Sequence, residues 1–129
     1  MNAKSNLPEA WFAKAEADLQ AAELLLNIEE PLVEIVCYHA QQCAEKYLKG
    51  YLIARKVSFR FVHELAYLTR LCTEQDLSFS TLLGLAAELQ DYATSVRYPN
   101  DEMEPLALAD AERAVDCARQ IRSFVIKSL

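Results

Sequence analysis

Apolar residues recur every three or four positions along most of the chain, which is the spacing of one face of an α-helix. The longest such stretch covers residues 31–56, and its apolar stripe consists of Val33, Val36, Cys37, Ala40, Ala44, Tyr47, Leu48 and Tyr51. A polar stripe lies nearly opposite, at about 100° per residue, and consists of His39, Gln42, Lys46 and Lys49. We therefore expect a long helix with a core face and a separate hydrogen-bonding, cationic face.

The same periodicity predicts four more helices. With the first, they give helices over residues 8–28, 31–56, 63–72, 80–97 and 108–129. Asn6 and Glu9 fit a capping box before the first helix, and Ser80 fits an N-cap for the fourth, after a polar linker over residues 73–78. The fourth helix should end before Pro99, because the residue before a proline disfavours the α conformation.

The connections between these helices are short, and no second strand exists that could pair with residues 57–62. Four long helices and a short one predict an all-α fold, an up-and-down four-helix bundle with an additional short helix, five helices in all. Its 129 residues suit a single domain over 1–129. Gly50, inside the long helix, predicts a close helix crossing there, either within the chain or with a second subunit.

Composition narrows the class of protein. Hydrophobic residues make up 53% of the chain and charged residues 25%, values typical of a globular protein. No apolar run approaches the ~20 residues of a membrane span, and the first residues lack the apolar core of a signal peptide. We therefore expect a cytoplasmic protein with no membrane contact.

The net charge of −6 argues against general coating of nucleic acid. Residues 46–63, however, contain five cations and no carboxylate: Lys46, Lys49, Arg55, Lys56 and Arg60. Such a window can bind a small anion, a nucleotide or a confined piece of RNA. The alternative is that these long side chains only solvate a helix end.

The cysteines Cys37, Cys43, Cys72 and Cys117 form no CxxC pair and fall mostly in apolar stripes, so we expect buried free thiols. His39 and Cys43 are one helical turn apart, but two ligands do not make a zinc site. No metal or other cofactor is expected.

Common enzyme motifs are absent, since the chain has no P-loop, GxGxxG or HExxH sequence. Candidate ligand-binding residues remain in three places: the polar stripe of His39, Gln42, Lys46 and Lys49, then His63 near Arg60, and Arg97 with Tyr98. Arginine suits phosphate, and histidine can move a proton near neutral pH. The structural alternatives are a capping role for His63, carbonyl binding by Arg97 and a solvent-facing lysine stripe.

Several of these segments together resemble a HEPN domain, named for nucleotide binding in higher eukaryotes and prokaryotes. The resemblance rests on residues 11–22, the segment CYHAQQCAEKYLK at 37–49, HEL at 63–65 and RYP at 97–99. It implies a helical bundle, usually a homodimer, often encoded beside a minimal nucleotidyltransferase. The implied activities are nucleotide binding in support of that partner protein, or metal-independent RNA cleavage as the toxin of a toxin–antitoxin pair.

The ribonuclease branch of this family pairs an Arg and a His at a spacing that the chain does not match. Arg60 and His63 are too close together, and Arg55 and His63 are too far apart. The leading hypothesis is therefore a homodimer that binds a nucleotide, a nucleotidyltransferase partner or both, without a confident catalytic residue. The alternatives are a ribonuclease toxin that uses Arg60 and His63, and a purely structural dimerisation module.

Overall fold

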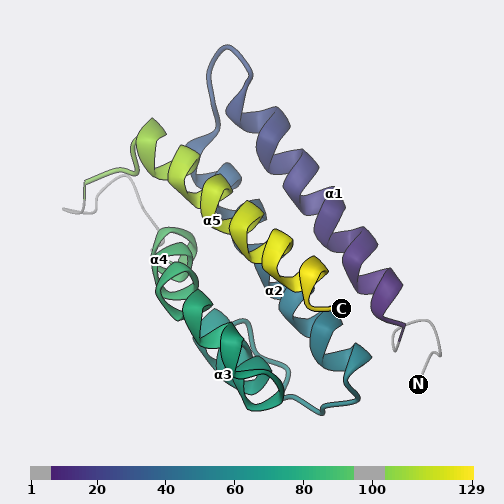
Figure 1. Ribbon diagram of the computed structural model, residues 1–129. Coiled ribbons are helices and arrows are strands. Elements are labelled where there is room, and N and C mark those ends of the chain that lie inside the picture. The colour runs from purple at the N-terminus through teal and green to yellow at the C-terminus, as the bar shows by residue number, and fades with distance from the viewer. Residues whose placement is uncertain (1–6, 95–103) are drawn as a thin grey trace.

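The computed structural model describes residues 7–94 and 104–129 (Figure 1). Within those ranges the chain forms no strand, and its helices are α1 (Pro8–Leu26), α2 (Val33–Ala54), α3 (Leu65–Gln75), the 3₁₀ helix η2 (Leu77–Leu82), α4 (Leu83–Thr94) and α5 (Leu108–Lys127). The predicted all-α bundle with five α-helices is confirmed. Asn6, Arg97 and Tyr98 lie outside the described residues.

Helix α2 is the centre of the bundle. It contacts α1, α3, α4 and α5, while α1 and α5 pack on it and touch each other much less (Figure 1). The predicted apolar stripe is almost wholly buried. Gln41, Glu45 and Lys49 are buried as well, because neighbours surround α2 on nearly every side. The expectation of a separate, accessible cationic face is therefore wrong for Lys49.

Gly50 marks the crossing of α1 over α2, as its position in the helix predicted. A Cβ atom built on Gly50 would lie 2.5 Å from Cε1 of Phe12, whose ring stacks on that of Tyr47. The close approach comes from a side chain of α1 rather than from its backbone. The absence of a Cβ at residue 50 therefore makes room for Phe12.

Some predicted helix boundaries are wrong. α3 begins at Leu65 rather than at His63, and it continues to Gln75, into the segment expected to be a linker. Asp76, not Ser80, is the cap that follows, because its side chain accepts a 3.0 Å hydrogen bond from the Ser78 N–H. Helix η2 then runs directly into α4. The turn chemistry of Asp76 and Ser78 produces this short 3₁₀ segment.

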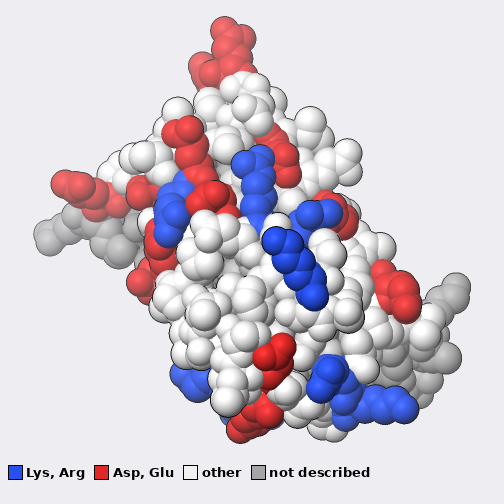
Figure 2. All heavy atoms as spheres, in the orientation of Figure 1, with Lys and Arg blue, Asp and Glu red and all other residues white. Residues whose placement is uncertain are grey.

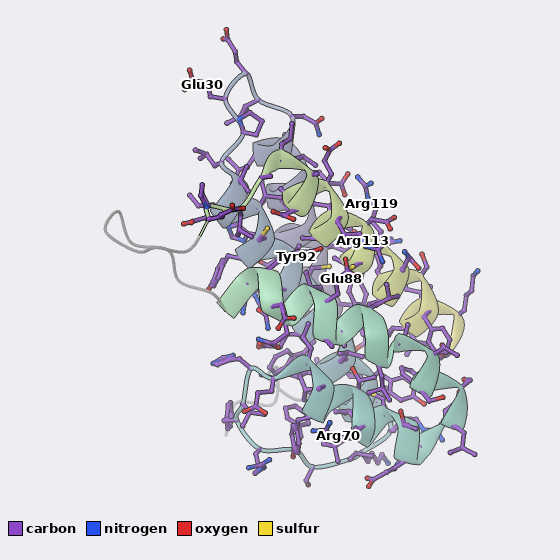
Figure 3. The ribbon with its side chains drawn as sticks, turned by 90° about the vertical axis from the view of Figure 1, so that its left-hand side faces the viewer. Glu30, Arg70, Glu88, Tyr92, Arg113 and Arg119 are labelled. Carbon is purple, nitrogen blue, oxygen red and sulfur yellow. The ribbon has the colours of Figure 1, made fainter. Side chains whose placement is uncertain are left out.

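Ion pairs tie α5 to its neighbours on either side. Arg113 forms a bidentate pair with Glu88 of α4, at 2.7 and 3.0 Å, and Tyr92 donates to the same carboxylate (Figure 3). Arg119 and Arg122 reach Glu23 and Glu16 of α1. Positive and negative side chains are accordingly interspersed on this face (Figure 2). Each of these three arginines is thus paired with an acidic side chain of a neighbouring helix.

The four cysteines are buried and none forms a disulfide, as predicted. Burial raises the pKa of the Cys72 thiol to about 12 and that of the Cys117 thiol to about 11, so both stay protonated at neutral pH. They pack as small apolar side chains. Among the residues described, no helix combines the length and apolar character needed to cross a bilayer.

Candidate functional site

A hollow of about 230 Å³ lies between the middle of α2, the connection that precedes α3, and the last turns of α4. It is lined by Tyr38, Gln41, Gln42, His63, Gln90 and Ala93. Helices α2 and α4 pack side by side, and His63 lies close to the last turns of α4. Gln42 and His63 are therefore predicted site residues that the fold brings together.

A chain of amide groups forms the floor of the hollow. Gln42 donates to the side-chain oxygen of Gln41 at 2.9 Å, and Gln41 donates to the His63 carbonyl at 2.9 Å. Gln90 accepts from the Leu65 N–H at 2.8 Å, at the start of α3. Because these hydrogen bonds hold the amides between three segments, their orientation is set before any ligand arrives.

The imidazole of His63 contacts the buried carboxylate of Glu45. Its Nδ1 lies 3.0 and 3.2 Å from the two oxygens of Glu45, whose side chain is 4% exposed, whereas that of His63 is 78% exposed. Nδ1 therefore points into the protein and donates to Glu45, which directs Nε2 away from the carboxylate. An accessible imidazole held in this way can donate to an anion or accept a proton.

Lys49, which is buried, neutralises the charge of Glu45. Its ammonium lies 3.0 Å from Glu45 Oε2 and is also only 4% exposed. The rings of Trp11 and Phe59 lie 5.8 and 5.9 Å from it, within the range of a cation–π contact. Lys49 was predicted to bind a ligand directly, but here its closest partners are groups of the chain itself.

His39 and Lys46 belong to a second, separate cluster. Both bind Asp18 of α1, with His39 Nδ1 2.9 Å from one carboxylate oxygen and the Lys46 ammonium on the other. Neither residue lines the hollow. The structure thus divides the predicted stripe into one pair that binds Asp18 and another, Gln42 and Lys49, whose partners Gln41 and Glu45 contact His63.

Arg60 packs against α3. Its guanidinium lies 4.5 Å from the centre of the Tyr67 ring, and its backbone N–H donates to the Tyr67 hydroxyl at 3.1 Å. Hydrogen bonds with Arg60 lower the pKa of that hydroxyl. Arg97 and Tyr98, the remaining predicted site residues, fall outside the described ranges, so their part in the site stays a prediction.

Besides Ala93, three polar or aromatic residues of the hollow were not predicted from the sequence. Gln41 is next to Gln42 and one turn before Glu45, so the run of polar residues at 41–46 was a usable signal. Tyr38 lies between the apolar and the polar stripe of α2, a position from which an exposed side chain could have been predicted. Gln90 reaches the hollow only through the packing of α4 on α2, which helical periodicity does not specify.

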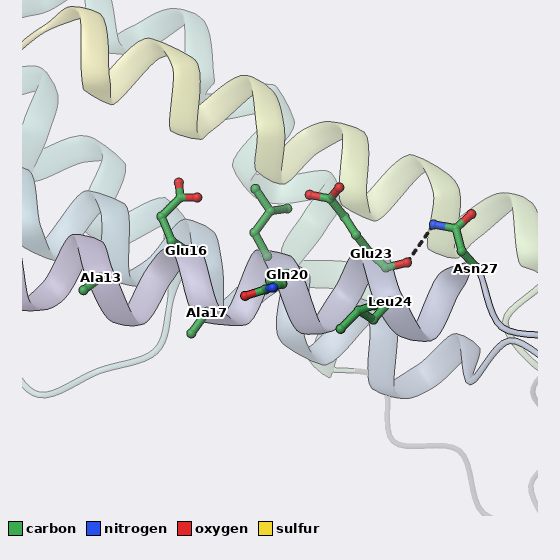
Figure 4. Close-up of a pocket in the computed structure, with 8 residues that line it drawn as sticks. Ala13, Glu16, Ala17, Gln20, Glu23, Leu24 and Asn27 are labelled. Atoms are coloured by element: carbon green, nitrogen blue, oxygen red, sulfur yellow. Dashed lines mark hydrogen bonds between the residues drawn. The ribbon is translucent and has the colours of Figure 1, made fainter.

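A larger groove of about 590 Å³ runs along α1, lined by Ala13, Glu16, Ala17, Leu19, Gln20, Glu23, Leu24 and Asn27 (Figure 4). Its charged side chains are the carboxylates of Glu16 and Glu23, both paired with arginines of α5. Burial alone would raise the pKa of Glu16, but hydrogen bonds from Tyr47 and Arg122 outweigh it and lower the pKa. This groove is consequently unsuited to a phosphate.

Metal ligation has no support in the part of the chain that the structure describes. Nowhere in residues 7–94 and 104–129 do three His, Cys, Asp or Glu side chains come together as potential ligands. The chemistry of the hollow is therefore that of amides, an aromatic ring and an imidazole paired with a carboxylate.

Comparison with known proteins identifies the class. The family model of the HEPN domain matches residues 8–129, and the chain belongs to this family. The crystal structure of an archaeal HEPN homologue superposes with a TM-score of 0.77 at 27% identity, covering 95% of this chain and 97% of that one. A Thermus thermophilus protein, TT1696, gives 0.74 at 28% identity, with 95% and 98% covered. A search of curated protein sequences finds no match.

Proposed function

We propose that this HEPN domain binds a nucleotide and that the hollow beside His63 holds its base. The observation that carries the proposal is the convergence of three glutamine amides, the Tyr38 ring and a carboxylate-held imidazole on one small cavity. Gln42 uses one N–H to bind Gln41 and keeps its second N–H and its oxygen, a donor and an acceptor of the kind that the edges of nucleobases pair with. Tyr38, 53% exposed, offers a ring on which a base can stack.

The size of the hollow favours a base over a whole nucleotide. Pockets that enclose a drug-sized ligand usually measure about 300–1,000 Å³, and this one measures about 230 Å³. One ring system fits, while the sugar and phosphates would remain outside. There the exposed imidazole of His63 is available to donate to a phosphate oxygen.

Calorimetric titration with mononucleotides tests this proposal. Gln42→Ala removes one hydrogen-bonding side chain from the hollow, and the loss of one neutral hydrogen bond should weaken binding about two- to tenfold. Gln20→Ala is the matched control, because Gln20 is an exposed glutamine of the α1 groove. Undetectable binding, or equal affinity in the wild type and Gln42→Ala, would contradict the proposal.

Metal-independent RNA cleavage is a second candidate. The observation in its favour is the imidazole of His63, which is accessible and oriented by Glu45 as a general base would be. Purified protein would be incubated with single-stranded and structured RNA in chelator, beside His63→Ala. Cleavage that depends on His63 would establish this activity, and intact RNA with both proteins would exclude it.

The family membership also supports a homodimer and a minimal nucleotidyltransferase as partner, in a two-gene system of the toxin–antitoxin type. One surface suits a second subunit: Leu32 and Ile35 lie at the start of α2 and are 44% and 45% exposed. A charge placed there by Ile35→Lys should separate the dimer in light scattering. A dimer that persists in this variant would place the interface elsewhere.

A further inference from the structure

The connection from α2 to α3 runs back along α2 and is held at both ends. It leaves α2 through a Schellman motif, in which the Val57 and Lys56 N–H groups donate to Leu52 and Ile53. Farther along, Phe59 packs over the Lys49 ammonium, and His63 reaches Glu45, one turn earlier on α2. This connection is consequently a fixed feature of the surface.

Phe61 stands at the tip of this connection. The Val62 N–H donates to the Arg60 carbonyl at 2.8 Å, which closes a three-residue turn with Phe61 at its centre. Arg60 is anchored on Tyr67 by its backbone N–H and its guanidinium. The Phe61 side chain is nevertheless 96% exposed. A ring presented to water on an anchored turn contributes nothing to the core of the chain.

The charge around Phe61 selects the kind of partner. Arg55, Lys56 and Arg60 precede it and Glu64 follows it, so cations outnumber carboxylates from residue 55 to residue 64. A partner must therefore bring negative charge together with flat apolar surfaces. A single strand of nucleic acid brings both, since its backbone is anionic and each base has a face that stacks on an aromatic ring.

Phe61 is also close to the hollow. One residue separates it from His63, and two steps of chain span at most about 7 Å. We propose that Phe61 is the stacking platform for the base next to the one in the hollow, so that the ligand is a single-stranded oligonucleotide. This inference rests on the proposed function and specifies its ligand class, because a mononucleotide would use the hollow alone.

The test compares labelled single-stranded RNA hexamers, by fluorescence anisotropy, with mononucleotides, by calorimetry. Phe61→Ala should weaken hexamer binding about five- to 150-fold, the range for loss of one stacked base, and leave mononucleotide binding unchanged. Phe61→Trp should retain hexamer binding. Leu77→Ala is the control, since Leu77 is an apolar residue 81% exposed on η2, and it should bind as the wild type does.

Equal hexamer affinity in Phe61→Ala and the wild type would overturn the inference, as would a hexamer that binds no tighter than a mononucleotide. Gln42→Ala separates this failure from that of the proposed function. If the hexamer loses affinity in Gln42→Ala but not in Phe61→Ala, the hollow binds a base and Phe61 does not. If only Phe61→Ala weakens the hexamer, stacking on Phe61 stands and the hollow is not the base site.

Discussion

Lys56 has a backbone conformation that glycine usually provides. Its φ of 59° lies in the left-handed region, and among the residues described no other non-glycine residue has a positive φ. It follows the C-cap Arg55, at the position where a Schellman motif most often has glycine. The Cβ of Lys56 is therefore a source of backbone strain at the end of α2.

We expect Lys56→Gly to be more stable than Lys56→Ala by about 1 kcal/mol, because only glycine removes the strain of the left-handed conformation. The two variants lose the same charge, so their difference isolates the effect of the backbone conformation. Urea denaturation followed by circular dichroism measures it. Equal midpoints would show that Lys56 is unstrained.

The buried pair of Glu45 and Lys49 should be far more sensitive to substitution than the pair of Asp18 and Lys46. Glu45→Gln leaves the Lys49 ammonium, 4% exposed, without its counter-ion, and a buried charge left unpaired costs about 3–5 kcal/mol. Asp18→Asn disturbs a more exposed pair and should cost about 1 kcal/mol or less.

Chemical denaturation of both variants measures the two costs. In Glu45→Gln with Lys49→Met no buried charge remains, so the double variant should recover most of the stability lost by Glu45→Gln. A double variant no more stable than Glu45→Gln would mean that the cost has another cause. The sequence predicted Lys49 as a polar helix position, but not its burial, because periodicity does not count the neighbours around a helix.

At the scale of the elements, Gly50 and Gly84 form a natural pair of test positions. Both lie in helices, where alanine is intrinsically more favourable by about 1 kcal/mol. A Cβ at Gly50 meets the Phe12 ring at 2.5 Å, whereas a Cβ at Gly84 meets nothing within 4 Å. Gly84→Ala should therefore raise the free energy of unfolding, and Gly50→Ala should lower it by about 1–3 kcal/mol through overpacking.

Thermal denaturation of the two glycine variants checks both signs. Phe12→Leu replaces the opposing ring with a smaller side chain. Combining it with Gly50→Ala should therefore restore part of the lost stability. If Gly50→Ala is as stable as Gly84→Ala, Gly50 is not needed to make room for the Phe12 ring.

The helices themselves were largely predictable from the sequence, because a buried face repeats at 3.6 residues whatever it packs against. Helix η2 was predicted only in part: residues 80–82 fall in the expected fourth helix, while Leu77 and Phe79, two positions apart, match no helical period. Phe79 is nevertheless fully buried, with its ring 4.4 Å from that of Tyr51. A contact across the bundle, not a local pattern, defines that segment.

At the scale of the whole molecule, ion pairs that join helices make stability depend on pH. Hydrogen bonds from Arg113 lower the pKa of Glu88 below its usual 4.5, and the pKa of Glu16 is lowered as well. A carboxylate with a lower pKa in the folded state stabilises the fold fully above its unfolded pKa, and this stabilisation is lost as the pH falls through the folded pKa.

We therefore expect the free energy of unfolding to fall on acidification below about pH 4.5, the usual pKa of these carboxyls. The fall should be less steep in Glu88→Gln, which has no carboxylate to protonate at that position. Denaturant titrations at a series of pH values measure both slopes. Identical acid dependence in the two proteins would show that the pair between α4 and α5 does not contribute.

The sequence predicts only those residues of the candidate site that do not depend on how the helices pack. Gln42 and His63 carry polar groups at positions that the sequence singled out, while Gln90 comes from α4 and depends on how two helices meet. The prediction of one continuous cationic face treated α2 as a surface helix. Its central place in the bundle instead separates His39 and Lys46, which bind Asp18, from the residues around the hollow.

The most direct test of the account is a two-dimensional NMR titration of the ¹⁵N-labelled protein with a mononucleotide. Nucleotide in the hollow should shift the backbone and side-chain amide signals of Gln41, Gln42 and Gln90, together with that of His63, and leave the signals of Gln20 and Glu23 in place. Shifts confined to the α1 groove, or no shifts at saturating nucleotide, would contradict the claim that the hollow beside His63 is the nucleotide site.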